Sequence, residues 1–275
     1  MARRRHPVIQ LKSRGQVEQM RRAGVVVAEA LELLREAVRP GVTTAELDAV
    51  AEEHIRGRGA VPSFLGYHGF PATICASVND EIVHGIPGDR VLRAGDIVSL
   101  DCGAIVDGWH GDAAVTVPVG TVAPELAELV AVTEAALWHA FASVRLGGRL
   151  SDIGHAVESY VRSRGTYGIV EEYVGHGIGT EMHQDPNVPN YGRGGRGPEL
   201  VEGLVLAVEP MVNLGSRHTR QLADGWTVVT QDGSPSAHFE HTFTLTPDGP
   251  WVLTALDGGR ARLEALGVSV PAYAA

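Results

Sequence analysis

The sequence predicts an α/β protein of the α+β kind, in which two related halves pack around a pseudo-twofold axis. The first observation is an internal repeat, because "GVTTAELDAVAEEHIRGRG" at 41–59 aligns without a gap on "GGRLSDIGHAVESYVRSRG" at 147–165. The second observation is the order of patterns, since a longer helical segment precedes each copy and a strand-rich stretch follows it. The chain therefore repeats a plan of helix, helix and strands, and a site is expected in the cleft between the halves.

The elements of the first half follow from periodicity and turn signals. Apolar residues at helical spacing predict a helix over Gln16–Val38, and the repeated segment predicts a second helix that closes at Gly59. The strands expected after it run roughly over Thr73–Val78, Ile97–Val106 and Ala113–Val119. Asp107 and Gly108 form a strong hairpin signal between the last two strands.

The second half repeats this plan. A helix is predicted over Pro124–Val144, followed by the second copy of the repeated helix. "LVLAVEPMVN" at 204–213 then predicts one apolar strand, and "SAHFEHTFTLTP" at 236–247 predicts another with period-two alternation. We expect a basic tail at 1–13 and a single domain at 14–275, whose halves cover about 14–120 and 121–255.

Composition excludes several classes of protein. The formal net charge of -10 argues against specific nucleic-acid binding, which needs a basic face. The basic start "MARRRH" has no apolar run behind it, so no secretory signal is predicted, and no apolar run is long enough to span a bilayer. Two cysteines are too few for a disulfide framework or a cysteine-rich zinc module. We therefore expect a cytoplasmic protein with no membrane partner.

Two aspartates lie inside the predicted strands of the first half, where Asp is uncommon. Pairing about the predicted turn brings Asp101 and Asp112 onto neighbouring strands, directly opposite or one diagonal step apart. A buried and unpaired carboxylate costs several kcal/mol unless a proton, a cation or a metal ion neutralises it. The pair therefore predicts a bound cation or a shared proton.

The second half carries the same feature. Glu209 lies in the apolar strand at 204–213, and the alternation of the last strand places His238, Glu240 and Thr242 on one face. Any one of these acids could be an ordinary surface or edge-strand residue, but four in apolar strands favour a common site. Such an oxygen-rich set with a single imidazole suits two hard or borderline divalent ions, and two ions suit hydrolysis.

Five segments together resemble the type I methionine aminopeptidases, a family with a duplicated fold called the pita-bread fold. The resemblance covers nearly the whole chain, from about Lys12 to Leu253. Its segments are "LGYHGFPATICASVNDEIVHGIP", "GDIVSLDCGAIVDGWHGDAAVT", "YVGHGIGTEMHQDPNVPNYG", "LVLAVEPMVN" and "DGWTVVTQDGSPSAHFEHTFTLT". It implies an antiparallel sheet covered by helices. Since no large helical insertion separates His183 from Glu209 and no zinc-finger extension is seen, we expect the short, bacterial-like form.

The resemblance also implies roles for individual residues. The metal ligands of the family fall on Asp101, Asp112, His176, Glu209 and Glu240. Its two substrate-contacting histidines fall on His84 and His183. The pocket for the methionine side chain falls on Tyr67, Phe70, Cys75 and Trp226, and Phe64 and Met182 are further candidates for its lining.

An activity and its partners follow from these roles. The family removes the N-terminal methionine of nascent proteins and peptides when the second residue is small, through a hydroxide that bridges two divalent metal ions. Glu209 is expected to act as the general base, and His183 as a donor to the reacting carbonyl oxygen. Co, Mn, Fe and Zn all suit such ligands. We expect a monomer, and the ribosome exit region is a further partner that the resemblance implies.

Two alternatives stay open at this point. An X-Pro peptidase of the same fold is one, although such enzymes usually carry an additional N-terminal domain for which this chain has no room. A catalytically inactive binding protein on this fold is the other, although such relatives lose metal ligands and all five positions are occupied here.

Overall fold

Helices and strands follow one another along the chain in the predicted order. A computed structural model describes residues 9–272, so most of the predicted tail at 1–13 lies outside the described residues. The helices within that range are α1 (Arg14–Ala37), α2 (Thr44–Gly57), α3 (Pro124–Ser143), α4 (Ser151–Arg164) and α5 (Arg260–Ala265), with a short 3₁₀ turn at Tyr67–Gly69. The first four match the predicted helices to within a few residues, whereas α5 was not predicted.

The helix starts have local causes. Ser13 and Gln16 form a capping box at the start of α1, in which each side chain satisfies the backbone N–H of the other residue. Thr43 and Glu46 do the same at the start of α2. α3 begins instead with Pro124, whose fixed φ suits the first helical position.

The strands form one large and two small sheets, and the strand pairs among the described residues are antiparallel. The large sheet contains β1 (Val61–Pro62), β2 (Ile74–Val78), β4 (Ile97–Val106), β5 (Trp109–Pro118), β7 (Gly175–Gly177), β8 (Gln184–Val188), β9 (Val205–Val208), β14 (Glu240–Thr246) and β15 (Gly249–Val252). One small sheet contains β13 (Ser236–His238), β10 (Met211–Asn213) and β6 (Gly168–Ile169). The other contains β11 (Thr219–Gln221), β12 (Val228–Thr230) and β3 (Glu81–Val83).

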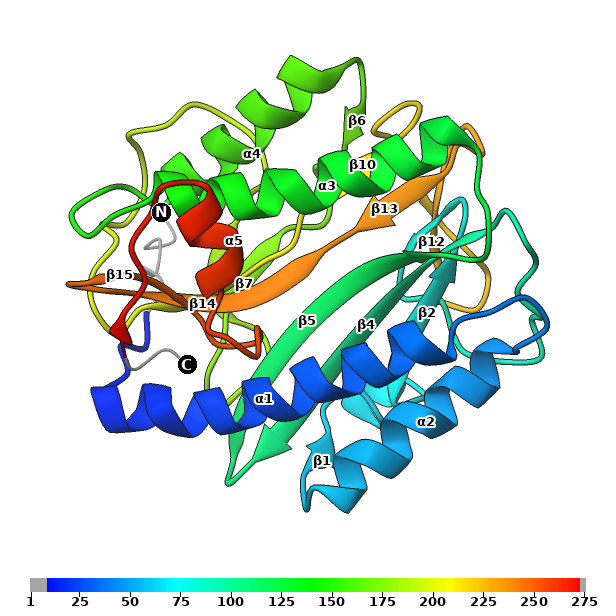
Figure 1. Cartoon of the computed structure of the whole chain (residues 1–275), viewed down its shortest axis with the longest axis horizontal. Coiled ribbons are helices and arrows are strands. Elements are labelled where there is room, and N and C mark those ends of the chain that lie inside the picture. The colour runs from blue at the N-terminus through cyan, green and yellow to red at the C-terminus, as the bar shows by residue number, and fades with distance from the viewer. Residues whose placement is uncertain (1–8, 273–275) are drawn as a thin grey trace, which may run out of the picture.

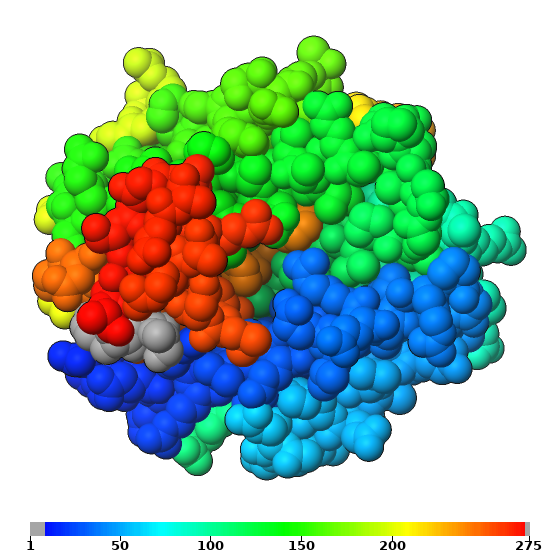
Figure 2. Space-filling view, in the orientation of Figure 1, coloured from blue at the N-terminus to red at the C-terminus, as the bar shows by residue number. Residues whose placement is uncertain are grey.

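The helices cover one face of this sheet system. α1 packs across β4 and β5, and α3 packs against β13, with α2 and α4 beside α1 and α3 respectively (Figure 1). In the space-filling view, α1 and α2 (blue) lie beside α3 and α4 (green) on this face, and part of the C-terminal segment (red) covers them (Figure 2). The predicted antiparallel sheet covered by helices is therefore confirmed. None of the helices within residues 9–272 has the length and apolar character needed to cross a bilayer.

The β4–β5 hairpin has the predicted turn. Asp107 and Gly108 both have positive φ, at 50° and 81°, as a two-residue turn of type I′ requires. The second strand starts earlier than predicted, at Trp109 rather than Ala113, because pairing continues without a gap from the turn. Asp112 consequently lies well inside a ten-residue strand.

Two strands of the second half were predicted as continuous, and this was wrong. The segment 204–213 divides into β9 in the large sheet and β10 in a small sheet, with Glu209 and Pro210 between them. The segment 236–247 divides into β13 and β14 at Phe239, again between the two sheets. Pro210 has no N–H for a ladder hydrogen bond, which is one physical reason for the break. Both glutamates therefore lie where the chain passes from one sheet to the other.

Helix α1 approaches the backbone of Leu253 closely at Gly24. A Cβ at this position would lie 2.1 Å from the backbone oxygen of Leu253. Gly24→Ala should therefore force the helix or the segment at Leu253 to move, and should lower the free energy of unfolding by about 1–3 kcal/mol. Urea unfolding monitored by circular dichroism measures this change.

Gly15 provides the matched control in the same helix. A Cβ there meets nothing within 4 Å, and Ala favours a helix over Gly by up to about 1 kcal/mol. Gly15→Ala should therefore leave the urea midpoint unchanged or raise it. Equal midpoints for Gly24→Ala and the unmodified protein would contradict the close approach of α1.

Candidate metal centre and substrate pocket

The β4–β5 hairpin supplies the two aspartates. Asp101 stands opposite Ala114, which is two residues from Asp112, so the carboxyl groups lie one diagonal step apart as predicted. Gly111 packs against Gly24 of α1, and side chains alternate along a strand. Asp112 therefore points to the face of the sheet opposite to that helix.

The third carboxylate completes a row across the sheet. Glu240, the first residue of β14, stands opposite Ala114 from the other side. The small side chain of Ala114 thus lies between Asp101 and Glu240, and it leaves room between their carboxyl groups. Glu209, at the break between β9 and β10, lines the same cavity as these three acids.

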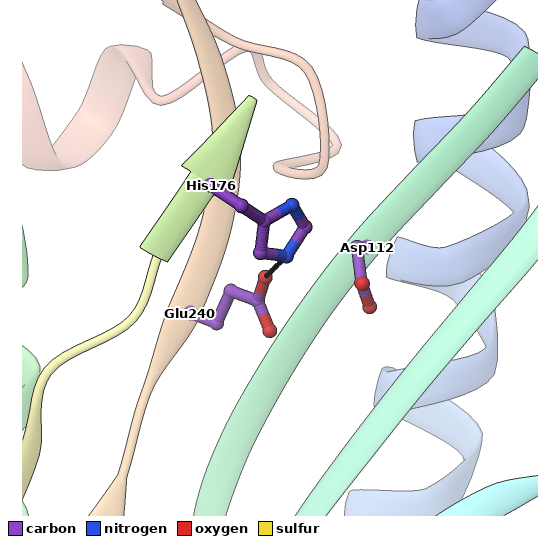
Figure 3. A group of neighbouring side chains, drawn as sticks. All are labelled: Asp112, His176 and Glu240. Atoms are coloured by element: carbon purple, nitrogen blue, oxygen red, sulfur yellow. Dashed lines mark ion pairs between the residues drawn. The ribbon is translucent and has the colours of Figure 1, made fainter. Parts of the chain in front are cut away.

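His176 is the imidazole that meets these carboxylates. Its Nδ1 lies 2.9 Å from the backbone oxygen of Gly177, a contact that needs the proton on Nδ1 and leaves a lone pair on Nε2. Nε2 lies 3.6 Å from Glu209 and 3.9 Å from Glu240. Figure 3 shows the side chains of His176 and Glu240 meeting, with Asp112 beside them on the neighbouring strand, and one ligand atom of each lies within 4.8 Å of the others.

Burial raises the pKa values of the four acids and so disfavours their charged forms. Burial raises the pKa of Asp101 to about 7, and it raises the pKa of Glu209 well above the usual range. The pKa values of Asp112 and Glu240 are raised in the same way, first by burial and then by the neighbouring carboxylates. At neutral pH the raised pKa values favour the protonated forms of Asp112, Glu209 and Glu240, and Asp101 is near its midpoint, unless positive charge is brought to the acids.

The residues present fit divalent metal ions. Oδ1 of Asp101, Oδ1 of Asp112 and Oε1 of Glu240 are buried and have no hydrogen-bond partner among the described residues. Such acceptors are normally satisfied, and a carboxylate left unpaired in the interior is costly. Four carboxylates with an imidazole lone pair form a donor set for hard or borderline divalent ions. A buried His, Asp and Glu cluster consistent with a metal site is therefore present.

An apolar pocket opens directly onto these acids. The cavity has a volume of about 150 Å³. Its lining includes the four residues predicted for a methionine side chain and the two further candidates: Tyr67, Phe70, Cys75 and Trp226, with Phe64 and Met182. These six pack as a cluster separate from the main core, in which the rings of Phe70 and Trp226 meet edge to face at 5.1 Å.

The two histidines predicted to contact substrate also line this cavity. Nδ1 of His183 lies 2.8 Å from the hydroxyl of Tyr67, so the phenol can donate to Nδ1 and leave an N–H at Nε2. His84 has a positive φ of 60°, and its ring meets Trp226 and Tyr173 edge to face. Burial lowers the pKa of His84 to about 4, so its ring is neutral at physiological pH.

One residue that the sequence interpretation did not select belongs to the same cluster. His238 lies with Glu209 and Glu240 in a second group of ligand atoms within 4.8 Å of one another. The period-two alternation of the last strand already placed His238 on the face of Glu240. That signal was present in the sequence, but the resemblance pointed to His176 alone.

The fold and the site together define a metal-dependent hydrolase, and comparison with known proteins gives its family. Residues 18–247 match the model of metallopeptidase family M24. The chain is 52% identical over 248 residues to a methionine aminopeptidase of Clostridium acetobutylicum. The alignment covers 90% of this chain and 99% of that protein. It is 51% identical over 253 residues to methionine aminopeptidase 1 of Mycobacterium tuberculosis, covering 90% and 95% respectively.

Solved structures agree with this comparison. The crystal structure of methionine aminopeptidase from Thermotoga maritima matches with a TM-score of 0.88 and 42% identity, covering 90% of this chain and all of that one. The chain belongs to metallopeptidase family M24 and, within it, to the type 1 methionine aminopeptidases. An X-Pro aminopeptidase of Thermotoga maritima, at a TM-score of 0.69 and 22% identity, shares the fold alone.

Proposed function

We propose that this chain removes the N-terminal methionine of peptides and nascent proteins when the second residue is small. The observation that carries the proposal is the juxtaposition of an apolar aromatic pocket with four buried carboxylates and the lone pair of His176. Full-length similarity to methionine aminopeptidases supports the same activity. The pocket suits an unbranched thioether, because sulfur makes favourable contacts with aromatic rings.

Five residues would hold two divalent ions at this site: Asp101, Asp112, His176, Glu209 and Glu240. When bound, such ions lower the pKa of coordinated water to near 7 and supply hydroxide at neutral pH. Co, Mn, Fe and Zn are all compatible with this donor set, and availability in the cell decides among them.

Three side chains of the protein would take the proton of water, polarise the carbonyl group and contact the peptide. Glu209 is partly open to the cavity and can take the proton of the attacking water as general base. The Nε2–H of His183 can donate to the carbonyl oxygen as negative charge develops there, with Tyr67 fixing the ring. Neutral His84 can contact the peptide nitrogen next to the scissile bond.

Peptide cleavage separates this proposal from its alternatives. Protein loaded with Co²⁺ or Mn²⁺ should release methionine from Met-Ala-Ser and leave Ala-Pro-Ala intact. Cleavage of Ala-Pro-Ala instead would favour the X-Pro peptidase, which at present has only a shared fold behind it. No cleavage of either peptide by metal-loaded protein would favour an inactive binding protein.

The second residue of the substrate gives a further prediction. Because the scissile bond is expected to lie deep in the cleft, Met-Gly, Met-Ala and Met-Ser starts should be cleaved, and Met-Lys and Met-Leu starts should be poor. The measurement is kcat/KM over a peptide series that differs only at this residue. Similar values across the series would show that the restriction is absent.

Four broader properties belong to the proposal. The protein acts in the cytoplasm as a monomer, on methionine at the start of nascent chains. It meets them near the ribosome exit region. Its domain at 14–275 consists of two related halves, about 14–120 and 121–255, and the two helix pairs on one face support this division.

A further inference from the structure

His238 carries an imidazole that the proposed mechanism does not use. It is the last residue of β13, its exposed fraction is 1%, and its neighbour across the small sheet is Met211. Neither Nδ1 nor Nε2 has a hydrogen-bond partner within residues 9–272. Buried ring nitrogens are normally bonded, and an unsatisfied buried donor or acceptor costs about 1–3 kcal/mol. The ring is therefore placed for a partner that is not part of the chain.

The position of the ring indicates what that partner is. Nε2 lies 3.7 Å from Oε2 of Glu209, which is too long for a hydrogen bond. Two atoms that each lie about 2.1 Å from one ion are about 3.0–4.2 Å apart, so this separation fits two ligands of the same metal ion. Ligand atoms of Glu209, Glu240 and His238 also lie within 4.8 Å of one another.

The two groups of ligand atoms overlap. His176 belongs to the group with Asp112 and Glu240, and His238 belongs to the group with Glu209 and Glu240. Nε2 of His176 also lies 3.6 Å from Oε1 of Glu209, so both imidazoles stand beside this carboxylate. We propose that His238 is a sixth protein ligand, which shares a metal ion with Glu209. This inference rests on the metal centre of the proposed function and adds a ligand to it.

A second imidazole changes which metals the centre prefers. Imidazole suits Zn, Cu, Fe and Ni, whereas carboxylate and water suit Mg and Mn, and sites with nitrogen ligands generally bind Co more tightly than Mn. The ion beside His238 should therefore be held more tightly when it is Co²⁺ or Zn²⁺ than when it is Mn²⁺. Substitution of His238 should reduce this difference.

Proton NMR of the Co²⁺-loaded protein in water tests the assignment directly. Cobalt shifts the exchangeable N–H signal of each ligating imidazole far outside the normal range, so ligating histidines can be counted. Protein with two bound Co²⁺ ions should show two such signals. One signal with two ions bound would overturn the proposal and leave the proposed function standing. Failure to bind Co²⁺ at all would instead remove the metal centre and both proposals with it.

Substitution assigns the second signal to its residue. His238→Gln should lose one shifted signal, and calorimetric titration with Co²⁺ should show at least about tenfold weaker binding of one ion. This figure is a lower limit, because loss of even an indirect partner typically weakens metal binding by 10–100-fold. An unchanged spectrum and unchanged affinities in a folded His238→Gln protein would show that His238 is not a ligand.

His110→Gln is the matched control. His110 is also a buried histidine, at 9% exposed, but its Nδ1 lies 3.0 Å from Oγ of Ser63, and it is outside both groups of ligand atoms. It should keep two shifted signals and both affinities. Should His238→Gln not fold, the signal count of the unmodified protein still decides the question.

Discussion

Replacing Asp101 with Asn should remove most of the turnover of Met-Ala-Ser. It should also lower the affinity for at least one metal ion by about tenfold or more, while the protein stays folded. The amide has nearly the shape of the carboxyl group but carries no negative charge. Oδ1 of Asp101 is buried without a hydrogen-bond partner among the described residues, so the substitution takes no hydrogen bond from this oxygen. Metal content, steady-state kinetics and a thermal unfolding curve measure the three parts of this expectation.

Asp107 gives the control for this substitution in the same hairpin. Its side chain is 69% exposed in the turn, at 3.9 Å from Arg22, and Asn also tolerates the positive φ found there. Asp107→Asn should therefore keep full metal content and activity. Full occupancy together with normal turnover in Asp101→Asn would refute the assignment of Asp101 as a ligand.

Removing the ring of His183 should cut kcat by about 10²–10³, equivalent to roughly 3–4 kcal/mol of transition-state stabilisation. The expected reason is the loss of a donor to the carbonyl oxygen, which matters most as charge develops, so KM should change little. Metal content should stay intact in His183→Ala. His176→Ala should instead lose metal and recover part of its activity at high metal concentration.

The two variants must be measured side by side, because the rings of His176 and His183 lie only 4.3 Å apart between centroids. Metal analysis after gel filtration and kinetics over a metal titration distinguish their roles. If His183→Ala loses metal as readily as His176→Ala, then His183 belongs to the metal ligands and not to the donors.

The first half of the centre could be predicted from the sequence because one local signal determines it. The Asp107-Gly108 turn fixes the strand register, and the register fixes the diagonal relation of Asp101 and Asp112. Helical periodicity likewise predicted the starts of the helices that Ser13 and Thr43 cap to within a few residues. These features depend on residues close together in the chain.

The second half could not be predicted in the same way. An apolar pattern shows that a strand is buried, but it does not show which sheet the strand belongs to. The passage from the large to the small sheet at Glu209 and Phe239 depends on pairing with distant segments. The choice of His176 needed a resemblance to known enzymes, and the proximity of His238 to Glu209 became visible only when β13 was placed beside Glu209.

The two pairs of acids differ in how firmly the strands hold them. The separation of Asp101 and Asp112 is set within one hairpin, where ten consecutive residue pairs hold it constant. Glu240 is held in the large sheet by its pairing with Ala114, whereas Glu209 lies between β9 and β10 and belongs to neither strand. A small rotation of the small sheet against the large one would leave the aspartates and Glu240 in place and act first on Glu209. Adjustment of the centre to ions of different radius therefore falls on Glu209.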